Sequence, residues 1–283
     1  ISNEFENNVN NNWYTSYIAA WSIRYTLEIL KKVKANQPDE YQRVLSKTDF
    51  DFTEETAAWN HLLNTIYFAF DKEKNVFLQQ DGFLDKELIP VSELDQKQLP
   101  LVDHWSWDRI LRSVYIKQAD VLQGMYFFED NFDIETIKRH YDFYEPFTLH
   151  ESSLSACVHS IIAAKIGNAG QAYKFYLQTA RLDLDDYNND SADGCHITSM
   201  AGTWLSVVQG FGGMRIKNDK VYLSPFLPPE WKGYSFHIVF RNTRMKIEID
   251  TNGTLVRHIA GPPCTFCING TDYRLNENAM IKS

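Results

Sequence analysis

Apolar residues recur at helical spacing from the start of the chain to about residue 210. Tyr14, Ile18 and Trp21 begin one such series, and Leu154 and Val158 begin another that continues to residue 166. Intervals of three and four residues place these side chains on one face of a helix. Further helices are predicted over 54–68, 105–128, 134–144, 169–182 and 197–209, the first with Asp51 and Glu54 as a capping box. The pattern therefore predicts seven helical segments.

The period changes to two after Gly212 and Gly213. Phe236, Ile238 and Phe240 alternate with His237, Val239 and Arg241, which is typical of strands with one buried face. The pairs at 252–253 and 269–270 are both Asn-Gly, the pair that favours a tight hairpin. We therefore predict a mainly α protein with a C-terminal β domain: a helical part over 1–213, then an antiparallel sheet or sandwich over 214–283.

The stretch from about 70 to 104 shows neither period. It is long for a connection inside a compact domain, and unstructured connections of that length usually have a function. We expect it to form a lid or an interface.

Composition narrows the classes of partner. The chain has 283 residues, 44% of them hydrophobic and 23% charged, which suits a globular protein of one large domain or two unequal ones. Its net charge of -9 argues against nucleic acid or an anionic membrane surface as the main partner. We see no apolar run long enough for a membrane span and no secretory leader.

The four cysteines do not form a disulfide framework in a chain of this length, and they favour a reducing cytoplasm. Cys264 and Cys267 form a CxxC pair, but their flanking pattern is that of a strand. The acidic run from Asp183 to Asp190 lacks the glycine and glutamate that a calcium loop requires. We predict no metal and no cofactor.

Residues 3–15 combine six asparagines with two carboxylates, Glu4 and Glu6, directly before a predicted helix. Amides both donate and accept hydrogen bonds, which suits sugar hydroxyls, and aromatic rings cover the apolar face of a pyranose. The plainer alternative is a polar start to a helix, and the segment alone does not decide between them.

Three other segments combine hydroxyl, cationic and amide groups. Ser152 and Ser153 lie at the start of a predicted helix, where backbone N–H groups and hydroxyls can bind an anion. His196 opens the next such segment. Lys117 and Gln118, inside the segment predicted as helix over 105–128, can bind hydroxyls or an anion. Helix capping, a structural histidine and a surface ion pair are the respective alternatives.

Five stretches of the chain, in order, resemble the family of inverting disaccharide phosphorylases: NEFENNVNNNWYT, KQADVLQG, FTLHESSLS, ARLDLDDYNND and HITSMAGTWLSVVQGFGGMR. The likeness runs from Asn3 to about Arg215 and continues loosely into the strands. It implies the second half of an (α/α)6 barrel followed by a small β domain. Members of the family carry an upstream β-sandwich and the first half of the barrel as well, so we expect the upstream part of the same enzyme as a partner.

The resemblance also implies roles for single residues. Glu4 matches the general acid, although Ile1 and Ser2 stand where the family has Gly-Pro. Lys117 and Gln118 match the pair that binds the transferred glucosyl residue. The residues that match the phosphate pocket are Ser152, Ser153, His196 and Ser199.

The implied reaction is inverting phosphorolysis of an α-linked glucose disaccharide. Maltose and phosphate would give β-D-glucose 1-phosphate and glucose, with phosphate as the nucleophile. Because Glu4 must be protonated when it acts, we predict that its pKa is raised. The alternatives are phosphorolysis of trehalose, kojibiose or nigerose, hydrolysis of an α-disaccharide, or a non-catalytic fragment or sugar-binding module. We expect a cytoplasmic homodimer.

Overall fold

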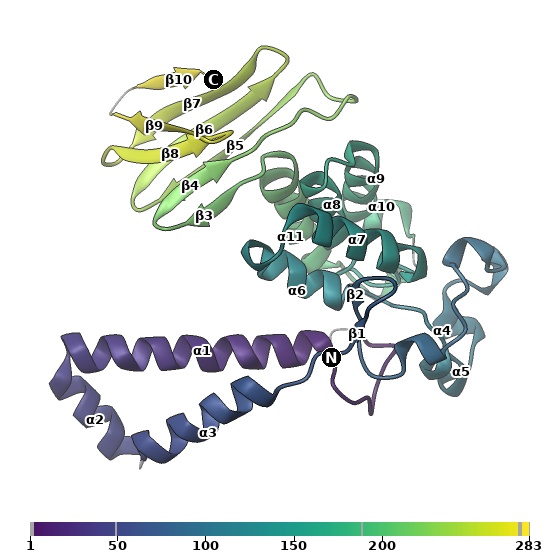
Figure 1. Cartoon of the computed structure of the whole chain (residues 1–283). Coiled ribbons are helices and arrows are strands. Elements are labelled where there is room, and N and C mark those ends of the chain that lie inside the picture. Colours follow the sequence, from purple (N-terminus) through teal and green to yellow (C-terminus); the bar gives the residue numbers. More distant parts are fainter. Residues whose placement is uncertain (1–2, 49, 188, 277–278, 283) are drawn as a thin grey trace.

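The computed structural model describes residues 3–48, 50–187, 189–276 and 279–282. Helices form most of the chain before residue 213, and strands form most of it afterwards (Figure 1). The helices are α1 (Trp13–Asn36), α2 (Pro38–Thr48), α3 (Phe52–Thr65), α4 (Leu101–His104), α5 (Trp107–Arg112), α6 (Val121–Phe127), α7 (Ile134–Tyr144), α8 (Ala156–Lys165), α9 (Ala169–Ala180), α10 (Leu182–Asp185), α11 (Ile197–Leu205) and the π-helical turn η7 (Ser206–Phe211).

Helices α1, α2 and α3 form an arm that extends from the helical body (Figure 1). Asn12 caps α1 by accepting the Thr15 N–H, and Trp13 is fully buried where α1 enters the body. Farther along α1, Trp21 is 43% exposed and Tyr25 is 51% exposed, and their rings stack on each other. Only the first turns of α1 therefore belong to the core.

Helices α1 and α6 run in the same direction. At its start α1 approaches α6 so closely that a Cβ on Gly124 would lie 2.5 Å from the Trp13 ring. One turn later Tyr17 packs on Phe128, with ring centroids 5.0 Å apart. A larger residue than glycine at position 124 would push the two helices apart.

Helices α6, α8 and α11 are also mutually parallel. Ile116 and Thr148, which precede α6 and α8, form a parallel bridge, and the far ends of these helices meet where Lys165 binds Glu129. A Cβ on Gly202 of α11 would lie 2.8 Å from Cys157 of α8, and Gly210 of η7 faces Ile161 farther along α8. The N-terminal ends of α1, α6, α8 and α11 therefore lie on one side of the helical body.

Most predicted helices are confirmed, with ends that shift by a few residues. Helix α7 is predicted to the residue, and Asp51 caps α3 by accepting N–H groups from Thr53 and Glu54. The single helix predicted over 105–128 is wrong: α5 and α6 flank a non-helical stretch. There Ile116 pairs with Thr148 instead of continuing a helix. Helix α2 was not predicted, because it is rich in charged residues and buries only Tyr41, so it has little apolar periodicity.

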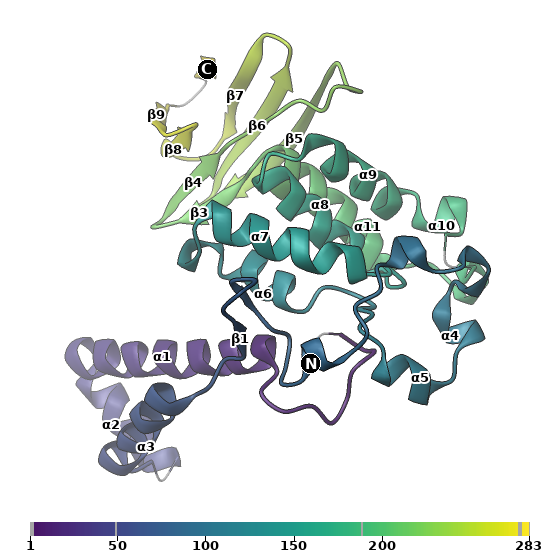
Figure 2. The ribbon, with the colours of Figure 1, turned by 45° about the vertical axis from the view of Figure 1, so that its right-hand side comes forward.

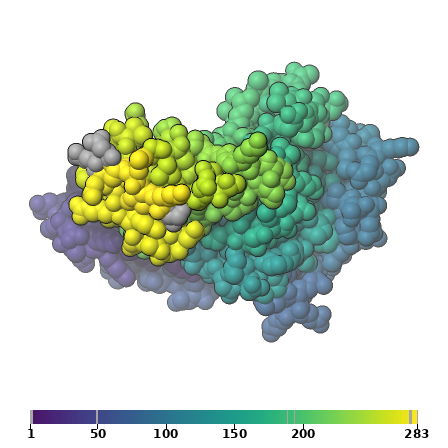
Figure 3. Space-filling model, turned by 90° about the horizontal axis from the view of Figure 1, so that it is seen from above, coloured from purple at the N-terminus to yellow at the C-terminus, as the bar shows by residue number. Residues whose placement is uncertain are grey.

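The part after residue 213 folds into two four-stranded sheets, ordered β10-β7-β6-β5 and β3-β4-β8-β9. Their inward residues share one apolar core. Figure 3 shows the C-terminal part, in yellow-green to yellow, lying against the teal middle part of the chain. The strands are β3 (Arg215–Lys217), β4 (Lys220–Leu223), β5 (Gly233–Phe240), β6 (Thr243–Asp250), β7 (Gly253–Ala260), β8 (Cys264–Ile268), β9 (Thr271–Leu275) and β10 (Met280–Lys282).

Both Asn-Gly pairs lie in tight hairpins, between β6 and β7 and between β8 and β9, as predicted. The expected alternation is also confirmed, since Phe236, Ile238 and Phe240 are buried and Val239 is exposed. One pairing departs from the expected antiparallel sheet: β4 and β8 are parallel. This is possible because the chain crosses through the other sheet between them.

The stretch from 70 to 104 contains the two-residue strands β1 (Phe70–Asp71) and β2 (Val76–Phe77), three 3-10 turns and α4. The turns are η1 (Phe83–Asp85), η2 (Val91–Glu93) and η3 (Gln96–Gln98). Similar turns elsewhere are η4 (Glu129–Asn131), η5 (Glu145–Phe147) and η6 (Ser191–Asp193). Within the described residues, no helix is both long and apolar enough to cross a membrane. The boundary at residue 213 stays a prediction.

Candidate active site

Each predicted site segment directly precedes one of the four parallel helices. Residues 3–12 lead into α1, 117–120 into α6, 150–155 into α8, and His196 caps α11. Because these helices run in the same direction, all four segments lie at one end of the helical body (Figure 2). The fold thus gathers residues that are more than a hundred positions apart in the sequence.

Glu4 is exposed, and its carboxylate accepts a hydrogen bond of 2.6 Å from the Lys117 ammonium. The Lys117 hydrogen bond is the main cause that lowers the pKa of Glu4, and a hydrogen bond from the Gln118 side chain adds to it. The predicted raised pKa is therefore wrong for this structure. Burial opposes the shift, but Glu4 is too exposed for burial to dominate. Ile1 and Ser2, which replace the family's Gly-Pro, lie outside the described residues.

Replacing Lys117 by methionine should raise the pKa of Glu4 toward that of an ordinary glutamate. A group that must be protonated to act loses activity as pH rises through its pKa, so that limb of the pH profile should move to higher pH. Carbon NMR of the Glu4 carboxyl measures the shift directly. Lys138→Met is a matched control, because Lys138 pairs with Asp142 on the exposed face of α7. An equal pKa of Glu4 in the wild type and in Lys117→Met would show that Lys117 is not what lowers it.

Asp120 fixes the segment that carries Glu4. Its buried carboxylate accepts the backbone N–H of Asn3 at 3.2 Å and the side-chain amide of Asn12 at 3.2 and 3.3 Å. The Asn3 amide oxygen in turn accepts the backbone N–H groups of Phe5 and Lys117. The sequence left open whether these asparagines bind sugar or form a polar start to a helix. The structure instead uses Asn3 and Asn12, both buried, to position the backbone on either side of Glu4.

Glu6, the second carboxylate of this segment, is buried and bound to Lys86. Gln80 donates a further hydrogen bond of 2.8 Å to the same oxygen. Burial lowers the pKa of Lys86 to about 8. Glu6 is thus held as an internal ion partner and does not face an open site.

The stretch from 70 to 104 holds the site segments through contacts that sequence analysis missed. The Gln79 carbonyl accepts the Trp13 N–H at 2.8 Å and the Asn12 amide at 3.1 Å. The Leu101 N–H donates to Glu151 at 2.7 Å. The role of the 70–104 stretch as a lid or an interface stays a prediction. In this structure the stretch supports the segments before α1 and α8.

Ser152 and Ser153 are half-buried in a turn just before α8, which begins at Ala156. The Ser152 hydroxyl accepts the Leu154 N–H at 3.2 Å. The Ile116–Thr148 bridge connects this turn to the Lys117 segment, so the two serines lie on the same side as Glu4. Burial raises the pKa of the neighbouring Glu151.

His196 and Ser199 are held by other protein groups. The His196 ring binds Asp183 at 2.5 Å and Asp190 at 3.4 Å, and the hydrogen bond to Asp183 is the main cause that raises the pKa of His196. The buried Ser199 hydroxyl donates to the Thr179 carbonyl at 2.8 Å. No hydrogen bond that the structure describes joins either residue to the Ser152 turn, so their phosphate role stays a prediction.

The parallel helices and the β domain that follows them place this chain in the class of helical-barrel proteins with a C-terminal β domain. Residues 2–205 match the glycosyl hydrolase family 65 central catalytic domain, and residues 214–275 match the glycosyl hydrolase family 65, C-terminal domain. The chain belongs to glycosyl hydrolase family 65. The family and the fold expected from the sequence are confirmed.

Its similar proteins include several disaccharide phosphorylases. It is 48% identical to maltose phosphorylase of Bacillus subtilis, 40% to alpha,alpha-trehalose phosphorylase of Thermoanaerobacter brockii and 32% to kojibiose phosphorylase of Caldanaerobacter subterraneus, over 92%, 90% and 91% of this chain. It spans about a third of the length of these relatives (33%, 33% and 34%). A solved structure titled putative kojibiose phosphorylase from human microbiome superposes with a TM-score of 0.89 at 36% identity, over 99% of this chain and 38% of that one.

Proposed function

We propose that this chain carries the general acid and part of the phosphate site of an inverting disaccharide phosphorylase. The observation that carries the proposal is the Glu4–Lys117 pair, which lies at the helix ends beside the Ser152 turn. The names of the similar proteins support the same reaction class.

In the proposed reaction Glu4 gives its proton to the glycosidic oxygen, and the bond from that oxygen to the anomeric carbon breaks. A phosphate oxygen forms the new bond at the opposite face of the sugar, which inverts the configuration. Glucose leaves with the proton from Glu4. Lys117 and Gln118 bind the transferred glucosyl residue, and Ser152, Ser153, His196 and Ser199 bind phosphate. The negative charge of bound phosphate raises the pKa of Glu4 and so favours its acid form.

Phosphorolysis is favoured over hydrolysis by the state of the other carboxylates. An inverting hydrolase needs a second carboxylate to activate water. Glu6 is buried against Lys86, and Glu151 accepts the Leu101 N–H. Both neighbouring candidates are thus engaged within the protein, whereas phosphate as nucleophile needs no base.

Maltose is the substrate we propose, because the maltose phosphorylase shares 48% identity with this chain against 40% and 32% for the trehalose and kojibiose enzymes. Phosphate is a substrate, and no cofactor is required. The upstream part of the same enzyme would cover the exposed rings of α1. The homodimer and the cytoplasmic location stay predictions.

The test is incubation of the chain with maltose and phosphate, followed by analysis of the sugars. We expect β-D-glucose 1-phosphate and glucose in equal amounts, and no reaction without phosphate. Glucose alone would indicate hydrolysis and contradict the proposal. No product would favour the alternative, a non-catalytic fragment or sugar-binding module. The same assay with trehalose, kojibiose and nigerose tests the choice of disaccharide.

A further inference from the structure

A cavity of about 720 Å³ lies between the helices and the β domain. The ends of α8 and η7 line one side, through Lys165 and Gln209, and strands β3 and β4 line the other. Its volume is in the range of cavities that hold small molecules. None of the candidate active-site residues lines it. The proposed function therefore leaves this cavity unexplained.

The cavity is distant from the candidate active site. Its helical wall contains the C-terminal end of α8 and the turn η7 that follows α11, whereas the active-site segments lie at the N-terminal ends of α8 and α11. The cavity and the candidate active site lie at opposite ends of α8, which has ten residues and is about 15 Å long. A ligand in the cavity would not overlap one at Glu4.

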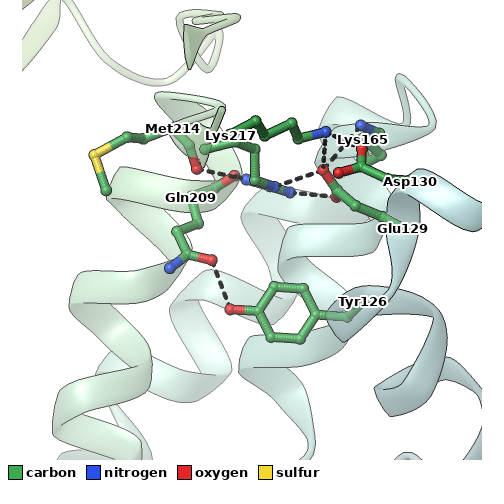
Figure 4. Close-up of polar contacts among 8 residues, drawn as sticks. Tyr126, Glu129, Asp130, Lys165, Gln209, Met214 and Lys217 are labelled. Carbon is green, nitrogen blue, oxygen red and sulfur yellow. Dashed lines mark hydrogen bonds and ion pairs between the residues drawn. The ribbon is translucent and has the colours of Figure 1, made fainter. Parts of the chain in front are cut away.

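The described lining contains three cationic side chains, Lys165, Arg215 and Lys217, and no acidic one. Behind them Glu129, only 9% exposed, accepts from Arg215 at 2.8 and 2.9 Å and lies 3.3 Å from Lys165 and 3.4 Å from Lys217. Figure 4 shows both lysines converging on this carboxylate. One buried carboxylate is thus shared by three cations.

The remaining charge balance is positive. Asp130 also pairs with Lys217, but its side chain is 64% exposed and water weakens that interaction. Three cations less two carboxylates leave one positive charge beside the cavity. An anionic group on a ligand would compensate it.

Arg215 and the two lysines differ in how many of their hydrogen-bond donors remain for a ligand. Arg215 directs Nε and Nη2 to Glu129, and Nη1 to the carbonyls of Gln209 and Met214. It is therefore fixed as part of the cavity wall. An ammonium group carries three donors. Lys165 is described with Glu129 alone and Lys217 with Glu129 and Asp130, so both have donors for an anion.

The rest of the lining suits a hydroxyl-rich molecule. Tyr222 and Phe226 supply partly buried aromatic rings, and Asn218 and Ser224 supply hydrogen-bonding groups. Aromatic faces cover the apolar side of a sugar ring, and lysine binds phosphate as a point charge. We propose that this cavity binds a phosphorylated sugar, with the phosphate at Lys165 and Lys217 and the sugar against Tyr222 and Phe226.

Isothermal calorimetry with glucose 6-phosphate tests the proposal. The proposed active site also binds phosphate, so the titration uses a chain that carries Ser152→Ala and Ser153→Ala. This background removes two of the four side chains assigned to that phosphate site, and binding is measured without turnover. The result is thus independent of the proposed function.

We expect glucose 6-phosphate to bind at least about tenfold more tightly than glucose or inorganic phosphate. Glucose lacks the phosphate that the lysines bind, and inorganic phosphate lacks the sugar ring that the aromatic residues contact. Lys165→Gln with Lys217→Gln should weaken binding by about tenfold or more. Lys246→Gln is the matched control on strand β6, where Lys246 pairs with Glu248 away from the cavity, and should leave binding unchanged. Circular dichroism checks the fold of each variant.

Tyr222→Ala provides a second variant that changes no charge. It should weaken the binding of glucose 6-phosphate and leave the weaker binding of inorganic phosphate unchanged. The proposal is overturned if the chain with both lysines and the chain with Lys165→Gln and Lys217→Gln bind glucose 6-phosphate with equal affinity. Equal affinity for inorganic phosphate and the sugar phosphate would also overturn it, because the cavity would then be a site for free phosphate only.

Discussion

Replacing Glu4 by glutamine should lower kcat for maltose phosphorolysis by roughly 10²–10⁴-fold, the usual contribution of a general acid. Glutamine keeps the size of the side chain and a hydrogen-bonding oxygen for Lys117, but it has no proton of suitable acidity for the leaving glucose. The KM for phosphate should change little, since Glu4 is not assigned to the phosphate site. Initial rates of β-D-glucose 1-phosphate formation at saturating maltose measure the effect.

A substrate with a better leaving group separates acid catalysis from structural damage. Fluoride leaves α-D-glucosyl fluoride with much less need of protonation, so Glu4→Gln should retain most of its activity on this substrate with phosphate. Lys117 and Gln118, the residues proposed to bind the glucosyl residue, are unchanged in the variant. Equal losses on maltose and on the fluoride would show that Glu4 acts in some way other than proton donation.

Replacing Asp120 by alanine should lower the free energy of unfolding by about 3 kcal/mol. The change removes a buried carboxylate and leaves the Asn3 N–H and part of the Asn12 amide without their acceptor. Urea denaturation measures the loss as a lower transition midpoint with an unchanged slope. Because Asp120 anchors both ends of the segment around Glu4, the folded variant should also lose activity.

The matched control for this change is Asp219→Ala. Asp219 pairs with Arg241, but its side chain is 77% exposed, and exposed ion pairs contribute little to stability. We expect a loss below about 1 kcal/mol at this position. A similar cost for the two substitutions would show that Asp120 does not hold the segment before α1.

The local pattern of the sequence was enough to predict the hairpins and most helices, because Asn-Gly pairs and apolar periodicity act over a few residues. It failed over 105–128, where the apolar spacing is helical but Ile116 pairs with Thr148. The competing partner lies 32 residues away, so no local pattern reveals it. The parallel β4–β8 pairing was missed for the same reason.

The site was only partly predictable. The motifs selected Glu4, Lys117 and the serines as candidates, but their common location depends on contacts such as Trp13 with Gly124. The support from the 70–104 stretch comes largely from backbone groups, the Gln79 carbonyl and the Leu101 N–H. Every residue supplies a carbonyl and nearly every residue an N–H, so these contacts leave no mark in the sequence. The lowered pKa of Glu4 depends on Lys117, 113 positions away.

The shared direction of the helices has an electrostatic consequence. Peptide dipoles in a helix add up to about half a positive charge at its N-terminus. The N-termini of α1, α8 and α11 lie on the same side, so these three helices together contribute roughly one and a half positive charges there. A chain with a net charge of -9 can therefore still attract a dianion at close range, through its backbone. This local field would survive substitution of any single side chain.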